Sequence, residues 1–297
     1  MDLSFTPLEF ALPPDACDCH THVYADPARF PMAPERVYTP EVVEAEELIG
    51  FHRRLGFGRV VVVHPNTHGT DNSVTLYAMR MYGAGARGVA LIDERTSDEE
   101  IESMTAAGMR GARINLRLRQ GDEADITSGR AQFQALANRA RTHGWHIQMF
   151  TSLQVISGIR ELVRDSPVPV VFDHFGGLDA ALGAVQPGFA DLLELLDSGK
   201  VWVKISAAYR SSTQGPEYAD VAPFARTLIE ANPDRILWGS DWPHPTGVTP
   251  PGRLATEITP MKTIDDGALL NQLAVWEPDA SVRRKILVNN PARLYGF

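Results

Sequence analysis

Two histidines separated by one residue, His20 and His22, stand at the end of the short apolar stretch Cys17-Asp18-Cys19-His20-Thr21-His22-Val23. Alternate side chains of a β-strand point to the same face, so on a strand both imidazoles would face one way, with Asp18 two residues behind them. Paired imidazoles can hold a metal ion or share the proton transfers of a hydrolysis. The pair alone is a weak signal, because surface histidines give the same pattern.

Acid–base side chains also follow other apolar stretches of the chain. His174 comes just after the stretch 168–172, and Asp241 and His244 follow the stretch 235–239. Imidazoles and carboxylates are the groups that transfer protons or bind metals in enzymes. Chance alone rarely places acid–base residues at the ends of three separate apolar stretches. We therefore interpret the following residues as one functional set: His20, His22, His174 and Asp241.

Arginines follow the same rule. Arg113 lies in the stretch 112–116, Arg119 lies shortly beyond it, and Arg210 follows the stretch 201–206. A guanidinium binds a carboxylate or sulfonate through paired hydrogen bonds that lysine cannot copy. In a chain with a net charge of -9, three arginines near one site predict a substrate with two anionic groups.

Apolar stretches and segments of helical periodicity alternate along the whole chain. The expected strands are 17–23, 60–64, 88–92, 112–116, 146–150, 168–172, 201–206 and 235–239. The expected helices between them are 40–55, 72–82, 98–107, 131–143, 153–164, 189–196 and 221–231, and a C-terminal helical extension follows at 266–276 and 281–288.

This alternation is typical of a (β/α)8 TIM barrel of class α/β. The doubly wound open sheet is the alternative, but the first strand lacks the Gly-x-Gly-x-x-Gly that a dinucleotide fold needs. We find no repeat or internal boundary, so residues 1–297 are predicted to form one domain.

In a barrel the reactive groups come from the C-terminal ends of the strands, which places the candidate residues on one rim. Two other polar residues of the strands have a structural interpretation. We expect His64 to be a core histidine with satisfied hydrogen bonds, and Lys204 to point between the barrel and the helices.

The composition of the chain limits the kinds of molecule that it is expected to bind. The chain is 44% hydrophobic and 22% charged, which is ordinary for a soluble protein, and its acidity argues against nucleic acid or an anionic membrane surface. Residues 1–14 lack a basic segment followed by an apolar core, so we expect a cytoplasmic protein, as monomer or homodimer. Cys17 and Cys19 are too close on one strand to form an unstrained disulfide and are expected to be reduced.

With these motifs in place, the chain resembles the amidohydrolase superfamily, and within it the branch of 2-pyrone-4,6-dicarboxylate lactonases and related sugar-lactone and sulfomuconolactone enzymes. The most specific motifs are His20-x-His22 and Gly239-Ser240-Asp241-Trp242-Pro243-His244. The matching stretches are 16–23, 30–40, 68–72, 111–115, 170–176, 201–209, 218–223, 234–245 and 289–297. The resemblance implies hydrolysis of an anionic lactone such as 2-pyrone-4,6-dicarboxylate.

The chain departs from the metal-dependent members of that superfamily. They usually add a lysine or glutamate at the fourth strand and a histidine at the fifth, where this chain has Arg113 with Asn115, and Gln148. A cation at Arg113 would also repel a divalent ion. We therefore expect no binuclear centre and favour a site without metal. The alternative is one Zn²⁺ held by His20, His22 and Asp241.

The resemblance also implies roles for the candidate residues. Asp241 would be the general base for water, and the histidines at 20, 22 and 174 would donate hydrogen bonds to the lactone carbonyl oxygen. The substrate would be bound by Arg113, Arg119, Arg210, Tyr38 and Asn66, although the branch often has serine at the last position. Other possible functions are a 4-sulfomuconolactone hydrolase, a sugar-acid lactone isomerase, a decarboxylase, which would need the full metal set, and a barrel that binds a ligand without catalysis.

Overall fold

Eight parallel strands form one sheet, and helices separate them along the chain. The computed structural model describes residues 5–116 and 122–297. In their order around the sheet, the strands are β1 (Cys17–Thr21), β3 (Arg59–Val63), β4 (Ala86–Ala90), β5 (Met109–Asn115), β6 (His146–Phe150), β7 (Val170–Phe172), β8 (Val201–Ser206) and β9 (Ile236–Gly239). The predicted (β/α)8 barrel is confirmed.

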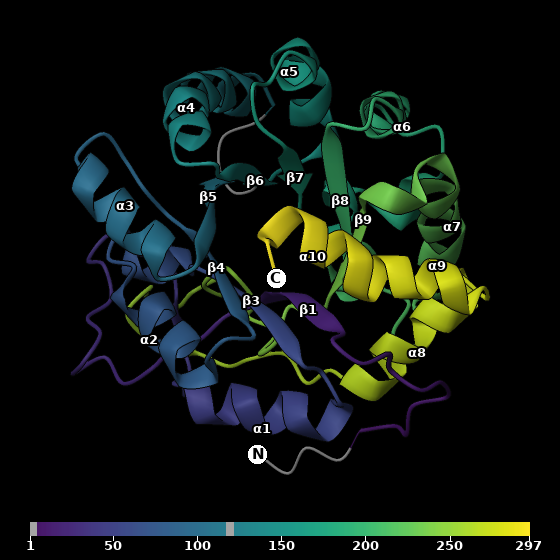
Figure 1. Cartoon of the computed structure of the whole chain (residues 1–297), viewed down its shortest axis with the longest axis horizontal. Helices are drawn as coiled ribbons and strands as arrows, with labels where there is room; N and C mark the ends of the chain where they lie inside the picture. Colours follow the sequence, from purple (N-terminus) through teal and green to yellow (C-terminus); the bar gives the residue numbers. More distant parts are fainter. Residues whose placement is uncertain (1–4, 117–121) are drawn as a thin grey trace.

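The helices form a ring outside the strands (Figure 1). They are α1 (Ala45–Leu55), α2 (Ser73–Tyr82), α3 (Asp98–Ala106), α4 (Asp122–Thr142), α5 (Leu153–Arg164), α6 (Phe189–Asp197), α7 (Ala222–Ala231) and α8 (Asp266–Trp276). Figure 1 shows α8 next to α7 in this ring, so the segment 266–276 is the eighth barrel helix rather than an extension.

Local sequence explains several helix ends. Ser97 begins α3 with a capping box, in which its hydroxyl accepts from the backbone of Glu100 at 3.2 Å while the Glu100 carboxylate accepts from the Ser97 backbone at 2.7 Å. Gly56 ends α1 in the left-handed conformation, with φ of 94°. By contrast, α4 begins at Asp122, nine residues before the start predicted at residue 131. The prediction missed these first turns because their sequence lacks apolar periodicity.

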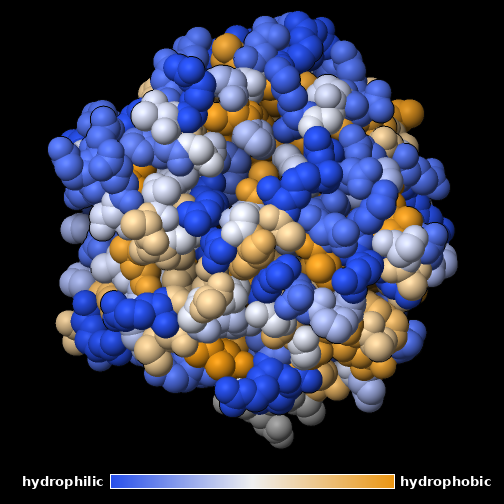
Figure 2. Space-filling view, in the orientation of Figure 1, coloured by the Kyte–Doolittle hydropathy of each residue, from blue (hydrophilic) through white to orange (hydrophobic). Residues whose placement is uncertain are grey.

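Two short helices extend the chain across one end of the barrel. They are α9 (Ala280–Arg284) and α10 (Asn290–Tyr295), and one π-helical turn, 285–289, joins them, where the sequence predicted a single helix over 281–288. Tyr295 is fully buried in a cluster with Cys17 and Cys19, so α10 closes the end at which β1 begins. Figure 2 shows hydrophilic residues interleaved with small hydrophobic patches on this face.

The strands are buried on both faces. In β3, Val60 and Val62 pack in the core under the helices, while Val61 and Val63 belong to the cluster inside the barrel. Both cysteines are free thiols in that inner cluster. In the described part of the chain, every helix is too short or too polar to span a bilayer.

A bulge in β1 determines which side chains enter the barrel. Asp18 is level with Val60 of β3 and Thr21 with Val62, so β1 has one extra residue between these pairs. Asp18 consequently faces outward, where its carboxylate accepts from Ser240 Oγ at 2.5 Å and lies 3.1 Å from His52 Nε2 of α1. The expectation that Asp18 lies on the same face as the two strand-end histidines is wrong, because the bulge resets the alternation.

Two buried histidines, His64 and His146, are part of the packed interior of the protein. His64 makes hydrogen bonds to Thr75 Oγ1 at 2.8 Å and to the carbonyl of Gly69 at 2.9 Å, as predicted for a core histidine. His146 lies inside the barrel at the start of β6, and neither ring nitrogen has a partner among the described residues. Burial lowers the pKa of each imidazole to about 3, so both are neutral in the folded protein.

We expect the free energy of unfolding to fall as the pH is lowered from about 6.5 toward 4. The folded pKa values lie below that of an unfolded histidine, about 6.5, so the unfolded chain takes up protons first and each buried histidine costs about 1.4 kcal/mol per pH unit in this window. Urea unfolding at several pH values would measure the slope. The variant His146→Leu should lose about one histidine's share of it, and equal slopes in both proteins would contradict the prediction.

Candidate active site

The predicted site residues converge on a pocket at the C-terminal ends of the strands. Its lining consists of His22, Tyr24, Val37, Tyr38, Pro65, Asn66, Arg113, Asn115, Phe150, His174, Arg210, Asp241, Pro245 and Gly247. The ring of His20 is adjacent, with its centroid 4.6 Å from that of His174 and 5.0 Å from that of His22. Of the predicted set, Arg119 lies outside the residues that the structure describes.

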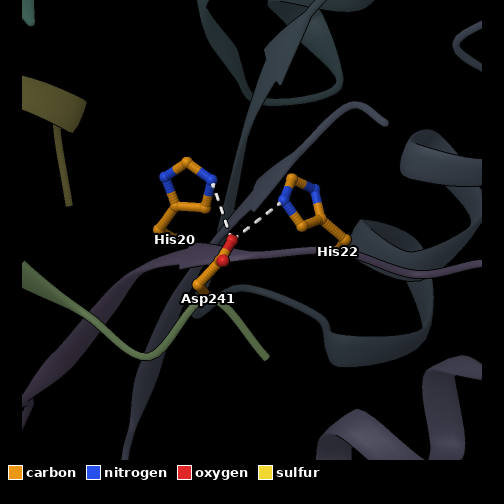
Figure 3. A group of neighbouring side chains, drawn as sticks. All are labelled: His20, His22 and Asp241. Atoms are coloured by element: carbon orange, nitrogen blue, oxygen red, sulfur yellow. Dashed lines mark ion pairs between the residues drawn. The ribbon is translucent and has the colours of Figure 1, made fainter. Parts of the chain in front are cut away.

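One carboxylate oxygen of Asp241 faces three imidazoles. Asp241 Oδ1 lies 3.3 Å from His22 Nε2, 3.6 Å from His20 Nε2 and 3.8 Å from His174 Nε2. Figure 3 shows the carboxylate directed between the rings of the first two histidines. Within the described chain this oxygen has no hydrogen-bond partner, although it is buried. It is therefore positioned to interact with a polar ligand.

The other oxygen of Asp241 is held in place. Oδ2 accepts a hydrogen bond from the Tyr209 hydroxyl at 2.7 Å and one from Arg210 Nε at 2.6 Å. Tyr209 also lies 3.2 Å from His244 Nδ1, and His244 Nε2 lies 3.0 Å from Asp266 Oδ2 at the start of α8. These contacts fix the orientation of the carboxylate from behind.

Two contacts of this site, Tyr209 and Asp266, had no role predicted from the sequence. Tyr209 stands next to Arg210 after β8, and that position is the signal that was available. Asp266 has no comparable signal, because it follows β9 by a long loop and reaches the site only through His244.

The backbone at Asp241 is adapted to this position. Its φ of 66° is left-handed, a conformation that aspartate tolerates better than most residues. Its N–H donates to the carbonyl of His20 at 2.8 Å, and the N–H of His22 donates to the carbonyl of Trp242 at 2.8 Å. The turn after β9 is thereby joined to β1, which sets the distance between the carboxylate and the imidazoles.

The charge states follow from burial and neighbouring charges. Burial lowers the pKa of His20 to about 4 and also lowers the pKa values of His22 and His174. Burial alone would raise the pKa of Asp241, but the charge of Arg210 outweighs it and holds this pKa well below its usual range. At neutral pH the site therefore combines an ionised carboxylate with neutral imidazoles.

Two guanidinium groups flank one aromatic ring of the pocket. The Cζ atoms of Arg113 and Arg210 each lie 5.8 Å from the ring centroid of Phe150. Arg113 donates to the carbonyl of His64 at 3.1 Å, and Arg210 donates to the carbonyl of Pro245 at 2.6 Å in addition to its ion pair with Asp241. The ion pair with Asp241 was not predicted from the sequence.

Other pocket atoms remain available to a polar ligand. Asn66 Oδ1, Asn115 Oδ1 and Arg113 Nε are buried and lack a hydrogen-bond partner in residues 5–116 and 122–297. The hydroxyl of Tyr38 lies 3.0 Å from that of Tyr24 at the edge of the same pocket.

A buried lysine lies inside the barrel next to His20. Lys204 Nζ lies 2.7 Å from Gln148 Oε1, 3.2 Å from His20 Nδ1 and 3.2 Å from Asp173 Oδ1. Burial alone would raise the pKa of Asp173, but the charge of Lys204 keeps it well below its usual range. The expectation that Lys204 points between the barrel and the helices is wrong, because it shares the inner face of β8 with Trp202.

The same residues include a possible metal site. His20, His22 and Asp241 each offer a ligand atom, and these atoms lie within 4.8 Å of one another. His22 Nδ1 makes its hydrogen bond with the carbonyl of Val63 at 2.8 Å, which only accepts, so Nε2 has the free lone pair that a metal needs. The group could thus hold a single ion by its distances, and Zn²⁺ suits such a donor set.

Comparisons with known proteins agree with this architecture. The family model described as Amidohydrolase matches residues 17–297. The chain is 38% identical to a 4-sulfomuconolactone hydrolase of Rhizobium radiobacter, over 98% of this chain and 93% of the relative. It is 36% identical to a 2-pyrone-4,6-dicarboxylate hydrolase of Comamonas testosteroni, over 97% of this chain and 92% of that relative. A crystal structure of an Agrobacterium tumefaciens protein superposes with a TM-score of 0.81 at 30% identity, covering 98% of both chains. This chain therefore belongs to the amidohydrolase family.

Proposed function

We propose that this protein hydrolyses the ring ester of an anionic lactone, with 2-pyrone-4,6-dicarboxylate as the first candidate and 4-sulfomuconolactone as the second. The observation that carries the proposal is the pair of guanidinium groups at Phe150, in the same pocket as Asp241 Oδ1, which has no hydrogen-bond partner among the described residues. A flat, doubly charged ring suits this combination of an aromatic face and two cations. The names of the relatives from Rhizobium and Comamonas support the same substrate class.

Asp241 is the proposed general base. Its Oδ1 would take a proton from the attacking water and later deliver a proton to the ring oxygen that leaves. His22 Nε2, which has a lone pair 3.3 Å from this oxygen, can share the transferred proton. The proposed role of His22 is therefore proton transfer, whereas the resemblance implied a hydrogen bond from His22 to the lactone carbonyl oxygen.

His20 and His174 are the proposed stabilisers of the oxyanion. Both present Nε2 toward the oxygen of Asp241 that faces the pocket, at 3.6 Å and 3.8 Å. A neutral imidazole with its proton on Nε2 can donate to the lactone carbonyl oxygen as negative charge develops there, and losing one such donor costs about 2.7–4 kcal/mol.

The proposed reaction needs no metal ion. The positions that support a second metal in other amidohydrolases carry Arg113 and Gln148, both turned into this barrel. A single zinc ion, if bound by His20, His22 and Asp241, would polarise the water and the carbonyl group. Every step above is assigned to side chains of the chain itself.

Asp241→Asn should lower kcat at least about 100-fold while leaving binding nearly intact, because asparagine also tolerates the left-handed backbone but cannot accept the proton. Turnover would be followed by loss of the ring's ultraviolet absorbance. Binding of isophthalate, a planar dicarboxylate without an ester, would be measured by calorimetry. Turnover near that of the wild type would refute the base assignment.

Arg113→Met should raise KM for a dicarboxylate lactone about 10- to 100-fold, because one charge-assisted contact worth about 1.5–3 kcal/mol is lost. An uncharged lactone should be affected much less. Arg110→Met is the matched control, since Arg110 is on the same strand but donates to the carbonyls of Thr105 and Met109. Equal effects of Arg113→Met on charged and uncharged substrates would contradict the carboxylate contact.

A panel of anionic lactones, assayed with and without a chelator, should show ring opening that the chelator leaves unchanged. Free-acid formation measured by titration separates hydrolysis from isomerisation, because moving the lactone linkage releases no new acid. Loss of activity on chelation, restored by added zinc, would overturn the metal-free mechanism. Isomerised lactone without new acid would favour the isomerase.

A further inference from the structure

The buried lysine beneath the pocket has a consequence for the proton on His20. The side chain of Lys204 is fully buried, and its three nearest polar neighbours are Gln148 Oε1, His20 Nδ1 and Asp173 Oδ1. An ammonium group has three N–H donors and no acceptor. Gln148 Oε1 and His20 Nδ1 accept hydrogen bonds from it, and Asp173 Oδ1 forms an ion pair with its charge.

The amide of Gln148 is oriented consistently with an ion pair. Its oxygen accepts from Lys204 Nζ, while its Nε2 donates to Asp173 Oδ2 at 3.0 Å. Arg113 Nη2 lies 3.8 Å from the same carboxylate oxygen. The ammonium group of Lys204 and the carboxylate of Asp173, linked by one amide, thus form a buried ion pair inside the barrel.

Because the ammonium only donates, His20 Nδ1 must accept, and the single proton of the neutral imidazole must then be on Nε2. His22 has the opposite arrangement, since its Nδ1 donates to the carbonyl of Val63. Two histidines that are one residue apart on the same strand would thus hold opposite tautomers. The difference comes only from what lies behind each ring.

We propose that Lys204 is a positioning residue that fixes His20 as the Nε2–H tautomer, which makes His20 a hydrogen-bond donor toward the pocket and removes it as a zinc ligand. A histidine that binds a metal usually donates its other N–H to a carboxylate or a carbonyl group. Asp173 Oδ1 lies 3.2 Å from His20 Nδ1 and could serve as that acceptor. Without the ammonium, the His20 proton would move to Nδ1, and the ligand set of His20, His22 and Asp241 would be complete.

The wild-type protein gives the first test. Nitrogen-15 NMR of histidine-labelled protein distinguishes protonated from unprotonated ring nitrogens, and His20→Gln and His22→Gln spectra assign the two signals. We expect His20 protonated on Nε2 and His22 protonated on Nδ1. A His20 signal protonated on Nδ1 would overturn the proposal, even if every Lys204 variant failed to fold.

The second test is the affinity for zinc without substrate, measured by calorimetry and metal analysis. Lys204→Met should bind Zn²⁺ at least about tenfold more tightly than the wild type, the size typical of a change beside a metal ligand, whereas Lys204→Arg should remain weak because it keeps the cation. Lys200→Met is the matched control, since Lys200 is exposed and donates to the carbonyl of Arg164. Folded Lys204→Met with wild-type zinc affinity would refute the proposal.

These measurements are separate from the proposed lactone hydrolysis. The tautomer and the zinc affinity are measured on the free protein. They therefore test the role of Lys204 even if no lactone substrate is found. Conversely, a lactonase whose His20 proton is on Nδ1 would keep the proposed function and lose the role of Lys204.

Discussion

The join between β1 and the turn after β9 is the constraint on which the rest of the structure depends. It closes the barrel, and it also carries His20, His22 and Asp241, since two backbone hydrogen bonds of 2.8 Å connect these residues across the join. The outward-facing carboxylate of Asp18 reinforces it by accepting from the N–H groups of Ser240 at 3.0 Å and His20 at 3.1 Å. The contacts that close the sheet therefore also hold the proposed catalytic groups together, and the bulge in β1 provides the extra residue that brings His20 inward.

The two oxygens of Asp241 experience different environments, and this asymmetry gives the site its chemistry. Oδ2 is bound by Arg210 and Tyr209, which stabilise the negative charge and weaken the carboxylate as a base. Oδ1 faces the imidazoles without a partner in the described residues. If an anionic group of the substrate forms an ion pair with Arg210, that arginine stabilises the charge of Asp241 less. The carboxylate then becomes a stronger base when the substrate is bound. The same arginine would then link recognition of the anion to activation of water.

The sequence predicted the barrel because eight apolar stretches alternate with helices, and it predicted the rim because polar residues end those stretches. It could not reveal the side of the barrel that each polar residue enters. Lys204 is an example: Val203 and Ile205 face the helices and Trp202 faces inward, an assignment that needs the register of neighbouring strands. Asp18 was misplaced because a bulge leaves no mark in the apolar pattern. The contact between His244 and Asp266 joins segments whose approach depends on the loop after β9.

The buried charges determine which ligands the barrel can accept. Among the described residues, three cations, Lys204, Arg113 and Arg210, pair with the two carboxylates of Asp173 and Asp241 in the pocket and the layer beneath it. This local excess is positive in a chain whose net charge is -9, so it attracts anions and opposes a divalent cation. A histidine that binds a metal usually donates its other N–H to an acceptor such as a carboxylate. Behind His20, the carboxylate of Asp173 and the ammonium group of Lys204 both lie 3.2 Å from Nδ1, and in the proposed tautomer this nitrogen accepts from the ammonium. A change of one supporting residue, from acceptor to donor, is enough to turn an imidazole from a metal ligand into a hydrogen-bond donor.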